Sequence, residues 1–574
     1  MFSLINYLKK YKARIIIGPS FKFIEAVTDL ITPILVALIL DDGIPNDNKK
    51  FIILISVAIL GMNLLGFICA IICSKCASKV SRGVGLDIRR DMYKSITELS
   101  ASEKDKYTTM AFTNRIVHDV NQIETAIGMT IRNVARAPFL LIGSTIAAII
   151  IDAKLSLIFL AIIPVILFIV ITIMKKASPK YIDAKRNLDR VSNVTRENLS
   201  GNRVVRAFNK QDYEIERFDK VNNSFTGTNL EIGKLSSIMQ PLLYLVVQLG
   251  IIGVVYFGGV QVNIGGMTQG KIISFINYFA QISASLVVIA RIIIIFTRTG
   301  ASIKRINEIY SLSPSIKQSK HAIELNKDMP ANIEFKNVCF SYNNQRNMVN
   351  DLSISIKEGS TIGVIGGTGS GKSTLVNLLP RFYEVTSGEI LINGINIKKY
   401  TLKSLRDYIS IVPQNPTLFK GTIESNLKFR NGNASLDEMI KALKISQSYE
   451  FVMEKPEGIK TRVERGGTNF SGGQRQRLTI ARALVDNPRI IILDDSSSAL
   501  DFETDYKLRK ALSTMLKTTT KIIVSQRTNS IKDADNIIVL DNGNVVGIGK
   551  HTELLKNCEV YKEIYNSQNK KEVL

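Results

Sequence analysis

Long apolar runs dominate the first 330 residues of the chain, whereas shorter runs with strand-like and helix-like spacing dominate the remainder. A helix that crosses a bilayer needs about 20 mostly apolar residues. Six stretches meet this requirement, near residues 15–40, 51–76, 126–151, 155–175, 238–262 and 272–298. The pattern predicts an all-α six-helix transmembrane domain followed by a soluble α/β domain.

The domain boundaries follow from the same pattern. Residues 1–310 form the predicted membrane domain, and residues 311–331 form a polar linker that contains Pro314 and Pro330. The soluble domain is expected to occupy residues 332–574. A chain of 574 residues is too long for a single core, which agrees with this division.

Two connections between the apolar stretches, 77–125 and 176–237, are long and rich in Lys and Arg. They contain little Pro or Gly and keep a helical spacing of apolar residues, so we expect the membrane helices to continue about 30 Å beyond the bilayer. Reversals with short transverse helices are predicted near Ser100–Phe112 and Ala207–Tyr213. The excess of cations in these connections predicts that they, and both termini, are cytoplasmic.

The net charge of +24 is concentrated in the apolar half of the chain. Residues 1–330 carry a net charge of +16 and residues 331–574 a net charge of +8. Because the excess lies between apolar runs, it indicates membrane orientation and not a nucleic-acid partner. No cleavable signal peptide is evident, since the first apolar stretch contains Glu25 and Asp29.

Several polar residues interrupt the predicted spans. They either line a substrate cavity or form hydrogen bonds between helices, and the sequence leaves both interpretations open. These residues are Glu25, Asp29, Arg136, Gln240, Gln248, Asn277, Gln281 and Arg291.

The soluble half contains a glycine-rich loop, Gly366–Ser373, between an apolar strand (Ile362–Ile365) and a helix. In this context backbone N–H groups and the helix N-terminus bind phosphate. Lys372 is expected to reach the terminal phosphates of a nucleotide. A second apolar strand ends at Asp494, which with Ser373 is expected to hold Mg²⁺.

The segment Asn469–Arg477, followed by that strand, resembles the signature of ATP-binding cassette (ABC) proteins. With six spans before the cassette, the chain resembles a half-transporter of the ABC exporter family (B-type, type IV) over nearly its whole length. The resemblance implies ATP and Mg²⁺ as cofactors, an adenine-stacking Tyr342, a Q-loop Gln414 that also faces Mg²⁺, and a D-loop with Asp501. The nucleotide-binding positions are Tyr342, Gly366, Thr368, Gly369, Ser370, Gly371, Lys372, Ser373, Thr374 and Gln414.

The resemblance also implies a dimer, in which the signature residues of one subunit close over ATP bound to the other. These signature residues are Ser471, Gly472, Gly473 and Gln474. They begin a helix, so their N-terminus suits the γ-phosphate.

The chain departs from the family pattern at two catalytic positions. Asp495 replaces the Glu that serves as base, and Gln526 replaces the switch-loop His. A shorter base loses reach to the attacking water, and Gln cannot become cationic. Because the signature is intact, these changes resemble those in the degenerate-site subunit of a heterodimeric exporter. The alternative is a homodimer that works slowly and in which these two positions have drifted.

The expected function is ATP-driven export of lipophilic compounds or drugs across the bacterial inner membrane, together with a second half-transporter. Export of peptides or lipids is the nearest alternative. A nucleotide-gated regulator or channel is a second alternative. The six spans argue against a soluble ABC protein that acts on DNA or ribosomes.

Overall fold

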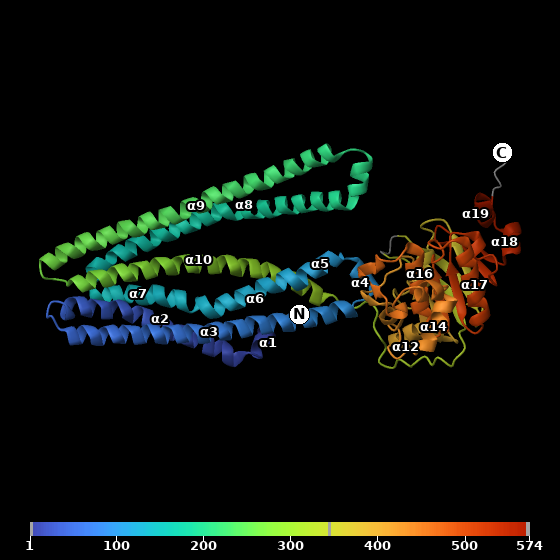
Figure 1. Ribbon diagram of the computed structural model, residues 1–574, viewed down its shortest axis with the longest axis horizontal. Helices are drawn as coiled ribbons and strands as arrows, with labels where there is room; N and C mark the ends of the chain where they lie inside the picture. The colour runs from blue at the N-terminus through green and yellow to red at the C-terminus, as the bar shows by residue number, and fades with distance from the viewer. Residues whose placement is uncertain (1–3, 343–345, 570–574) are drawn as a thin grey trace. The chain divides into compact units, whose positions relative to one another are not determined.

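A computed structural model describes residues 4–342 and 346–569 of the chain (Figure 1). Its contacts divide the chain into two units. One unit contains Met1–Thr97 and Thr109–Ser311, and the other contains Glu98–Thr108 and Leu312–Leu574. The segment Glu98–Thr108 therefore belongs with the soluble unit, although it interrupts the membrane half in sequence.

Among its described residues, the first unit has six helical segments that are long and apolar enough to cross a membrane, which confirms the predicted six-helix architecture. They are Lys12–Gly43, Lys49–Glu98, Thr109–Ile151, Ala153–Ala207, Gln211–Asn263 and Gln269–Ser311. In Figure 1 they correspond to α2 (Lys12–Leu38), α3 (Lys49–Glu98), α5 to α7 (Thr109–Asn114, Val120–Met129, Arg136–Ile151), α8 (Ala153–Ala207), α9 (Gln211–Asn263) and α10 (Gln269–Ser311).

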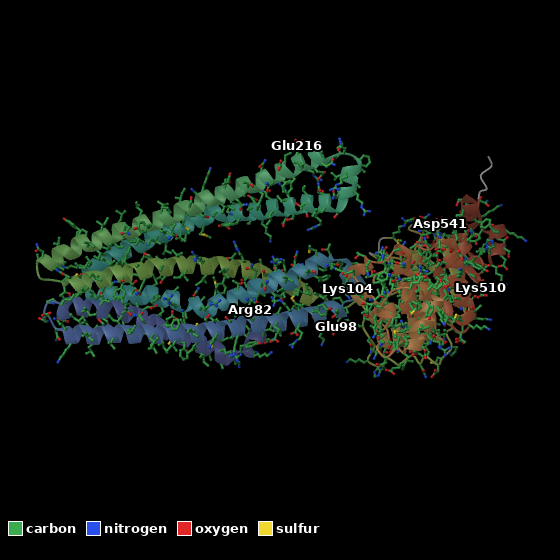
Figure 2. All side chains as sticks on the ribbon, viewed as in Figure 1. Arg82, Glu98, Lys104, Glu216, Lys510 and Asp541 are labelled. Atoms are coloured by element: carbon green, nitrogen blue, oxygen red, sulfur yellow. The ribbon has the colours of Figure 1, made fainter. Side chains whose placement is uncertain are left out.

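The helices α3, α8 and α9 are 50, 55 and 53 residues long. At 1.5 Å per residue they extend about 75–83 Å, more than twice the thickness of a hydrocarbon core. The parts of these helices beyond the apolar runs carry polar side chains, including Arg82 and Glu216 (Figure 2). Arg82 pairs with Glu124 at 2.7 Å, and Glu216 pairs with Lys220 at 2.8 Å. Ion pairs of this kind suit helices that continue into water.

The two reversals differ from each other. A separate short helix, α4 (Ala101–Asp105), lies in the first. In the second, α8 runs to Ala207 and α9 begins at Gln211, so no separate short helix stands between them. Instead, the last turns of α8 bend across toward α9 (Figure 1).

The membrane unit packs around aromatic side chains near the N-terminal end of α10. Phe159 of α8 lies 5.5 and 5.2 Å, centroid to centroid, from Phe275 and Phe279, and all three rings are buried. Tyr278 is also fully buried and donates a hydrogen bond to the carbonyl of Leu30 at 2.7 Å. These contacts hold α2, α8 and α10 together.

The soluble unit contains a ten-stranded sheet with helices around it, as predicted for an α/β ATPase domain. The strand order is β5-β4-β1-β2-β12-β11-β3-β10-β9-β6. The bounds are β1 (Ile333–Phe340), β2 (Val349–Ile356), β3 (Thr361–Gly366), β4 (Ser387–Ile392), β5 (Ile395–Asn396), β6 (Ile409–Val412), β9 (Ile490–Asp494), β10 (Thr520–Val524), β11 (Asn536–Asp541) and β12 (Asn544–Gly549). A small second sheet pairs β7 (Gly421–Thr422) with β8 (Arg462–Val463).

Besides α4, the helices of this unit lie between and after the strands. They are α11 (Lys372–Leu378), α12 (Leu402–Tyr408), α13 (Ile423–Leu427), α14 (Leu436–Ile445), α15 (Tyr449–Met453), α16 (Gly472–Leu484), α17 (Phe502–Met515), α18 (His551–Asn557) and α19 (Glu559–Asn569).

Five neighbouring strands, β11, β3, β10, β9 and β6, run parallel. They are almost entirely buried, which explains their continuous Ile, Leu and Val runs. Parallel strands end at the same edge of a sheet, and ligands of α/β proteins bind at that edge. The loops after β3, β9, β10 and β6 are therefore brought together.

Candidate functional site

The glycine-rich loop after β3 has a backbone that only glycine accommodates at two positions. Gly366 and Gly371 have φ angles of 158° and 101°. A Cβ atom at Gly371 would lie 2.1 Å from the carbonyl oxygen of Met348, and one at Gly366 would lie 2.0 Å from that of Leu540. The loop therefore curls tightly around the N-terminus of α11, as a phosphate cradle requires.

Lys372, the first residue of α11, folds back over this loop. Its ammonium group donates hydrogen bonds to the carbonyls of Gly366 at 2.9 Å and Gly367 at 2.6 Å. Burial lowers the pKa of Lys372, and the nearby carboxylates of Asp495 and Asp494 oppose that shift. The cation thus lies above the cradle, next to the acids that end β9.

Within the cradle, Ser370 is 3% exposed, and its hydroxyl has no hydrogen-bond partner among the described residues. Thr374 shares a hydrogen bond of 3.1 Å with Tyr342, whereas Thr368 and Gly369 lie at the exposed tip of the loop. A buried hydroxyl without a partner is costly. It fits a ligand that supplies the missing oxygen contact.

Two of the three predicted magnesium ligands, Ser373 and Asp494, lie in contact. The Ser373 hydroxyl donates to the Asp494 carboxylate at 3.0 Å. Burial raises the pKa of Asp494, while the hydrogen bond from Ser373 lowers it. A hydroxyl and a carboxylate oxygen side by side suit Mg²⁺, which commonly uses one or two protein oxygens together with nucleotide phosphates.

Asp495 follows directly and has a left-handed backbone, with φ 47°. Its N–H donates to the carbonyl of Val524 on β10 at 3.0 Å, which ties the turn to the neighbouring strand. One carboxylate oxygen, Oδ2, accepts a hydrogen bond from Nε2 of Gln414 at 3.2 Å. The structure therefore brings together three of the predicted groups, the Q-loop amide and both carboxylates.

Gln526, after β10, is an exposed side chain with no hydrogen bond of its own among the described residues. Asp501 is the N-cap of α17 and accepts hydrogen bonds from the Thr504 N–H at 2.8 Å and hydroxyl at 2.9 Å. These bonds lower the pKa of Asp501. Its carboxylate is thus engaged within its own loop.

The signature residues form the start of α16. Ser471 caps this helix, because its hydroxyl accepts from the N–H of Gln474 at 3.2 Å and its own N–H donates to the Gln474 side chain at 3.1 Å. Ser471 and Gly472 are exposed, and a Cβ atom at Gly473 would lie 3.2 Å from the carbonyl of Ala499. The helix start is therefore ordered within its own chain and open to a ligand.

Tyr342 presents a half-exposed ring, as a residue that stacks on a base would. Its ring packs edge-on against Tyr383 at 5.1 Å and Phe340 at 4.9 Å. Tyr383 in turn donates to the carboxylate of Asp105 at 2.6 Å, and burial, together with this contact, raises the pKa of Tyr383 above its usual range. Sequence reasoning missed Tyr383, because nothing marks a tyrosine that supports another tyrosine 41 residues away.

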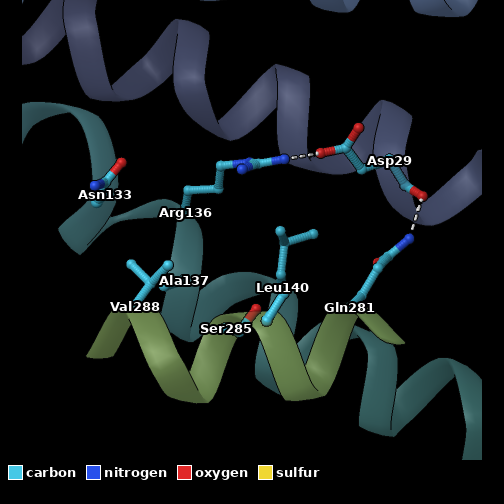
Figure 3. A pocket seen from close by; sticks show the side chains of 9 residues that line it. Asp29, Asn133, Arg136, Ala137, Leu140, Gln281, Ser285 and Val288 are labelled. Carbon is cyan, nitrogen blue, oxygen red and sulfur yellow. Dashed lines mark hydrogen bonds and ion pairs between the residues drawn. The ribbon is translucent and has the colours of Figure 1, made fainter. Parts of the chain in front are cut away.

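The membrane unit contains a cavity of about 260 Å³ lined by α2, α7, α10 and the turn before α7 (Figure 3). Arg136 donates to Asp29 at 2.7 Å and lies 3.8 Å from Glu25, which also pairs with Lys22 at 2.7 Å. The other lining residues are Asn133, Ala137, Leu140, Gln281, Ala284, Ser285 and Val288. Both interpretations of the polar positions therefore apply to Asp29 and Arg136, which form an interhelical ion pair and also line a cavity.

Other intramembrane polar residues have different surroundings. Gln281, which also lines the cavity of Figure 3, links α10 to α2 and α7, since it donates to the carbonyl of Asp29 at 3.0 Å and accepts from Ser144 at 3.1 Å. Asn277 bonds a carbonyl of its own helix, and Arg291 lines a separate, mostly apolar cavity of about 170 Å³. Only part of the polar set is thus gathered around the cavity of Figure 3.

Comparison with known proteins gives two family matches. The model of the ABC transporter transmembrane region matches residues 15–286, and the ABC transporter model matches residues 349–498. Together they extend from the first membrane helix to the D-loop.

Among relatives, the chain is 32% identical to the uncharacterized ABC transporter ATP-binding protein YfiB of Bacillus subtilis, over 99% of this chain and 98% of that protein. It is 30% identical to an ATP-dependent lipid A-core flippase of Wigglesworthia glossinidia brevipalpis, over 98% and 96% of the two chains. A solved structure of a bacterial Atm1-family ABC exporter with ATP bound superimposes with a TM-score of 0.81 over 99% of both chains. At 22% identity, this likeness concerns the fold alone.

Proposed function

Because the chain belongs to the ABC transporter family, as a multi-pass membrane protein with an ATP-binding domain, we propose that it is one subunit of a heterodimeric exporter and carries its degenerate ATP site. One observation supports this proposal above the others. Asp495 and Gln526 replace both residues that would activate hydrolysis, whereas Ser471 still forms an ordered, exposed signature helix start.

In this proposal ATP binds with its phosphates in the Gly366–Ser373 loop and its adenine on Tyr342. Lys372 turns from the loop carbonyls to the terminal phosphates, and the Ser370 hydroxyl gains its missing partner. Ser373, Asp494 and the amide oxygen of Gln414 would hold Mg²⁺, which supplies positive charge to the phosphates. In this proposal, ATP bound to this loop is released slowly and hydrolysed slowly, because the short side chain of Asp495 does not reach the attacking water.

The signature of this chain acts on the other nucleotide. The exposed N–H groups at the start of α16 and the Ser471 hydroxyl would contact the γ-phosphate of ATP bound to the partner subunit. Closure of the two cassettes would switch the membrane helices from inward to outward access.

The proposed cargo is a lipophilic compound or drug, and the proposed location is the bacterial inner membrane with both termini cytoplasmic. The mostly apolar cavity beside Arg291 supports a lipophilic cargo. The similarity to a lipid A-core flippase favours a lipid as the second candidate. A peptide cargo and a slow homodimer remain alternatives for the same fold.

The test compares this chain alone with the chain co-purified with a second half-transporter from the same cell, both in lipid nanodiscs and proteoliposomes. We expect ATP hydrolysis and dye export only from the pair. Full-rate hydrolysis and export by this chain alone would refute the heterodimer. ATP binding without transport in any pairing would favour a nucleotide-gated regulator.

A further inference from the structure

The last helix of the soluble unit, α19, presents one face to the rest of the domain. Tyr561 is fully buried, and Ile564, one turn later, packs against the core. Gln568 follows at the next turn of the same face. The helix is thus anchored at its start and brings Gln568 to the loop after β10.

Gln568 uses both ends of its amide on that loop. Its oxygen accepts hydrogen bonds from the N–H of Thr528 at 2.8 Å and the hydroxyl of Thr528 at 3.0 Å, and its nitrogen donates to the carbonyl of Gln526 at 2.6 Å. Thr528 is fully buried, and the Gln568 oxygen is the only acceptor for its N–H among the described residues. Without Gln568, a buried donor would lose its partner.

The residue between these two contacts, Arg527, connects the same loop to the D-loop. Its guanidinium donates to the carbonyls of Ser497, Ser498 and Leu500 at 3.5, 3.3 and 3.4 Å. It also lies over the ring of Phe502, 5.3 Å from the centroid. Contacts therefore run without a break from α19 through residues 526–528 to residues 497–502.

We propose that Gln568 is a positioning residue, which holds the switch loop (Ser525–Thr528) and, through Arg527, the D-loop in the arrangement that receives the γ-phosphate of ATP. Gln568 itself touches no nucleotide. The proposal rests on the role suggested above for Gln526, and it adds that the C-terminal helix sets the position of that residue.

The first test measures hydrogen exchange of the full chain without nucleotide in nanodiscs, with fragmentation that resolves the Thr528 amide. Gln568→Ala should raise exchange at Thr528 by about tenfold, the effect of losing the partner of a buried donor. Gln568→Glu keeps the acceptor for Thr528 and should preserve its protection. Ser567→Ala is the matched control, because among the described residues that hydroxyl bonds only the carbonyl of Ile564 on its own helix.

The second test measures how long nucleotides stay bound to the same proteins. Gln568→Ala should shorten retention of ATP by about fivefold and leave ADP retention unchanged, because ADP lacks the γ-phosphate. Equal losses for both nucleotides, or equal effects of Gln568→Ala and Ser567→Ala, would overturn the proposal and indicate general weakening of α19. Unchanged exchange at Thr528 would overturn it as well. Failure of the wild-type pair to transport would refute the proposed export function but leave the exchange result intact.

Discussion

Lengthening Asp495 to glutamate tests whether the reach of this carboxylate limits hydrolysis at the site of this chain. The substitution Asp495→Glu adds one C–C bond, about 1.5 Å, to the reach of the side chain. A well-placed general base accelerates a reaction by about 10²- to 10⁴-fold, or about 3–5 kcal/mol of activation free energy.

One contact opposes this gain. The hydrogen bond from Gln414 to Asp495, at 3.2 Å, would have to rearrange, and its loss costs about 1 kcal/mol. The expected net change is about 2–4 kcal/mol, which corresponds to a rate increase of about 30- to 1000-fold.

The assay is phosphate release from the purified transporter, with the partner's nucleotide site disabled so that only ATP on this chain turns over. Asp495→Asn is the control, because it keeps the size of the side chain and removes the base. Adding Gln526→His to Asp495→Glu should raise the rate further. A change of less than threefold for Asp495→Glu, with ATP still bound, would contradict the idea that the short side chain limits hydrolysis.

Three further predictions concern other parts of the chain. Ser471→Ala should lower ATP hydrolysis by the heterodimer at least about tenfold, since it removes a γ-phosphate contact and a helix cap of about 1 kcal/mol, while ATP labelling of this chain's own loop stays unchanged. Arg136→Gln should lower the melting temperature in nanodiscs, because it leaves Asp29 unpaired beside the cavity, and adding Asp29→Asn should restore most of the loss. Burial and the charge of Lys532 lower the pKa of His551, so the folded protein holds this ring neutral and its stability should fall as the pH drops below the unfolded value of about 6.5. Melting curves from pH 7.5 to 5.5 should show a smaller decline for His551→Gln than for the wild type.

The success of sequence reasoning differed between local and long-range features. The six spans and the phosphate loop follow from continuous patterns, so Lys372 and Ser373 could be placed on a helix start from sequence alone. Asp494 could be placed beside them, because parallel strands that end in polar residues share one edge of the sheet. The interhelical pair of Asp29 and Arg136 was visible only as two unusual charges, since helix packing decides which residues meet across 107 positions.

Side chains that support the site left no pattern at all. Gln568 bonds a residue 42 positions away through the register of a helix that sequence does not specify. Tyr383 likewise contacts Tyr342 because a loop returns beside the first strand. Such positions carry ordinary residue types, and only the folded arrangement distinguishes them.

The geometry around Asp495 suggests that the base is withdrawn for two separate reasons. Its side chain is short, and its Oδ2 atom is tied to the amide nitrogen of Gln414. The amide oxygen of Gln414 has no partner among the described residues, so the same side chain is free to bind Mg²⁺ while it holds Asp495. Binding of Mg²⁺ to the amide oxygen and of Asp495 to the amide nitrogen would then reinforce each other, because both contacts fix the side chain of Gln414. In the proposed role, a site built in this way would favour holding ATP over cleaving it, and Gln414→Ala should weaken magnesium-dependent ATP retention.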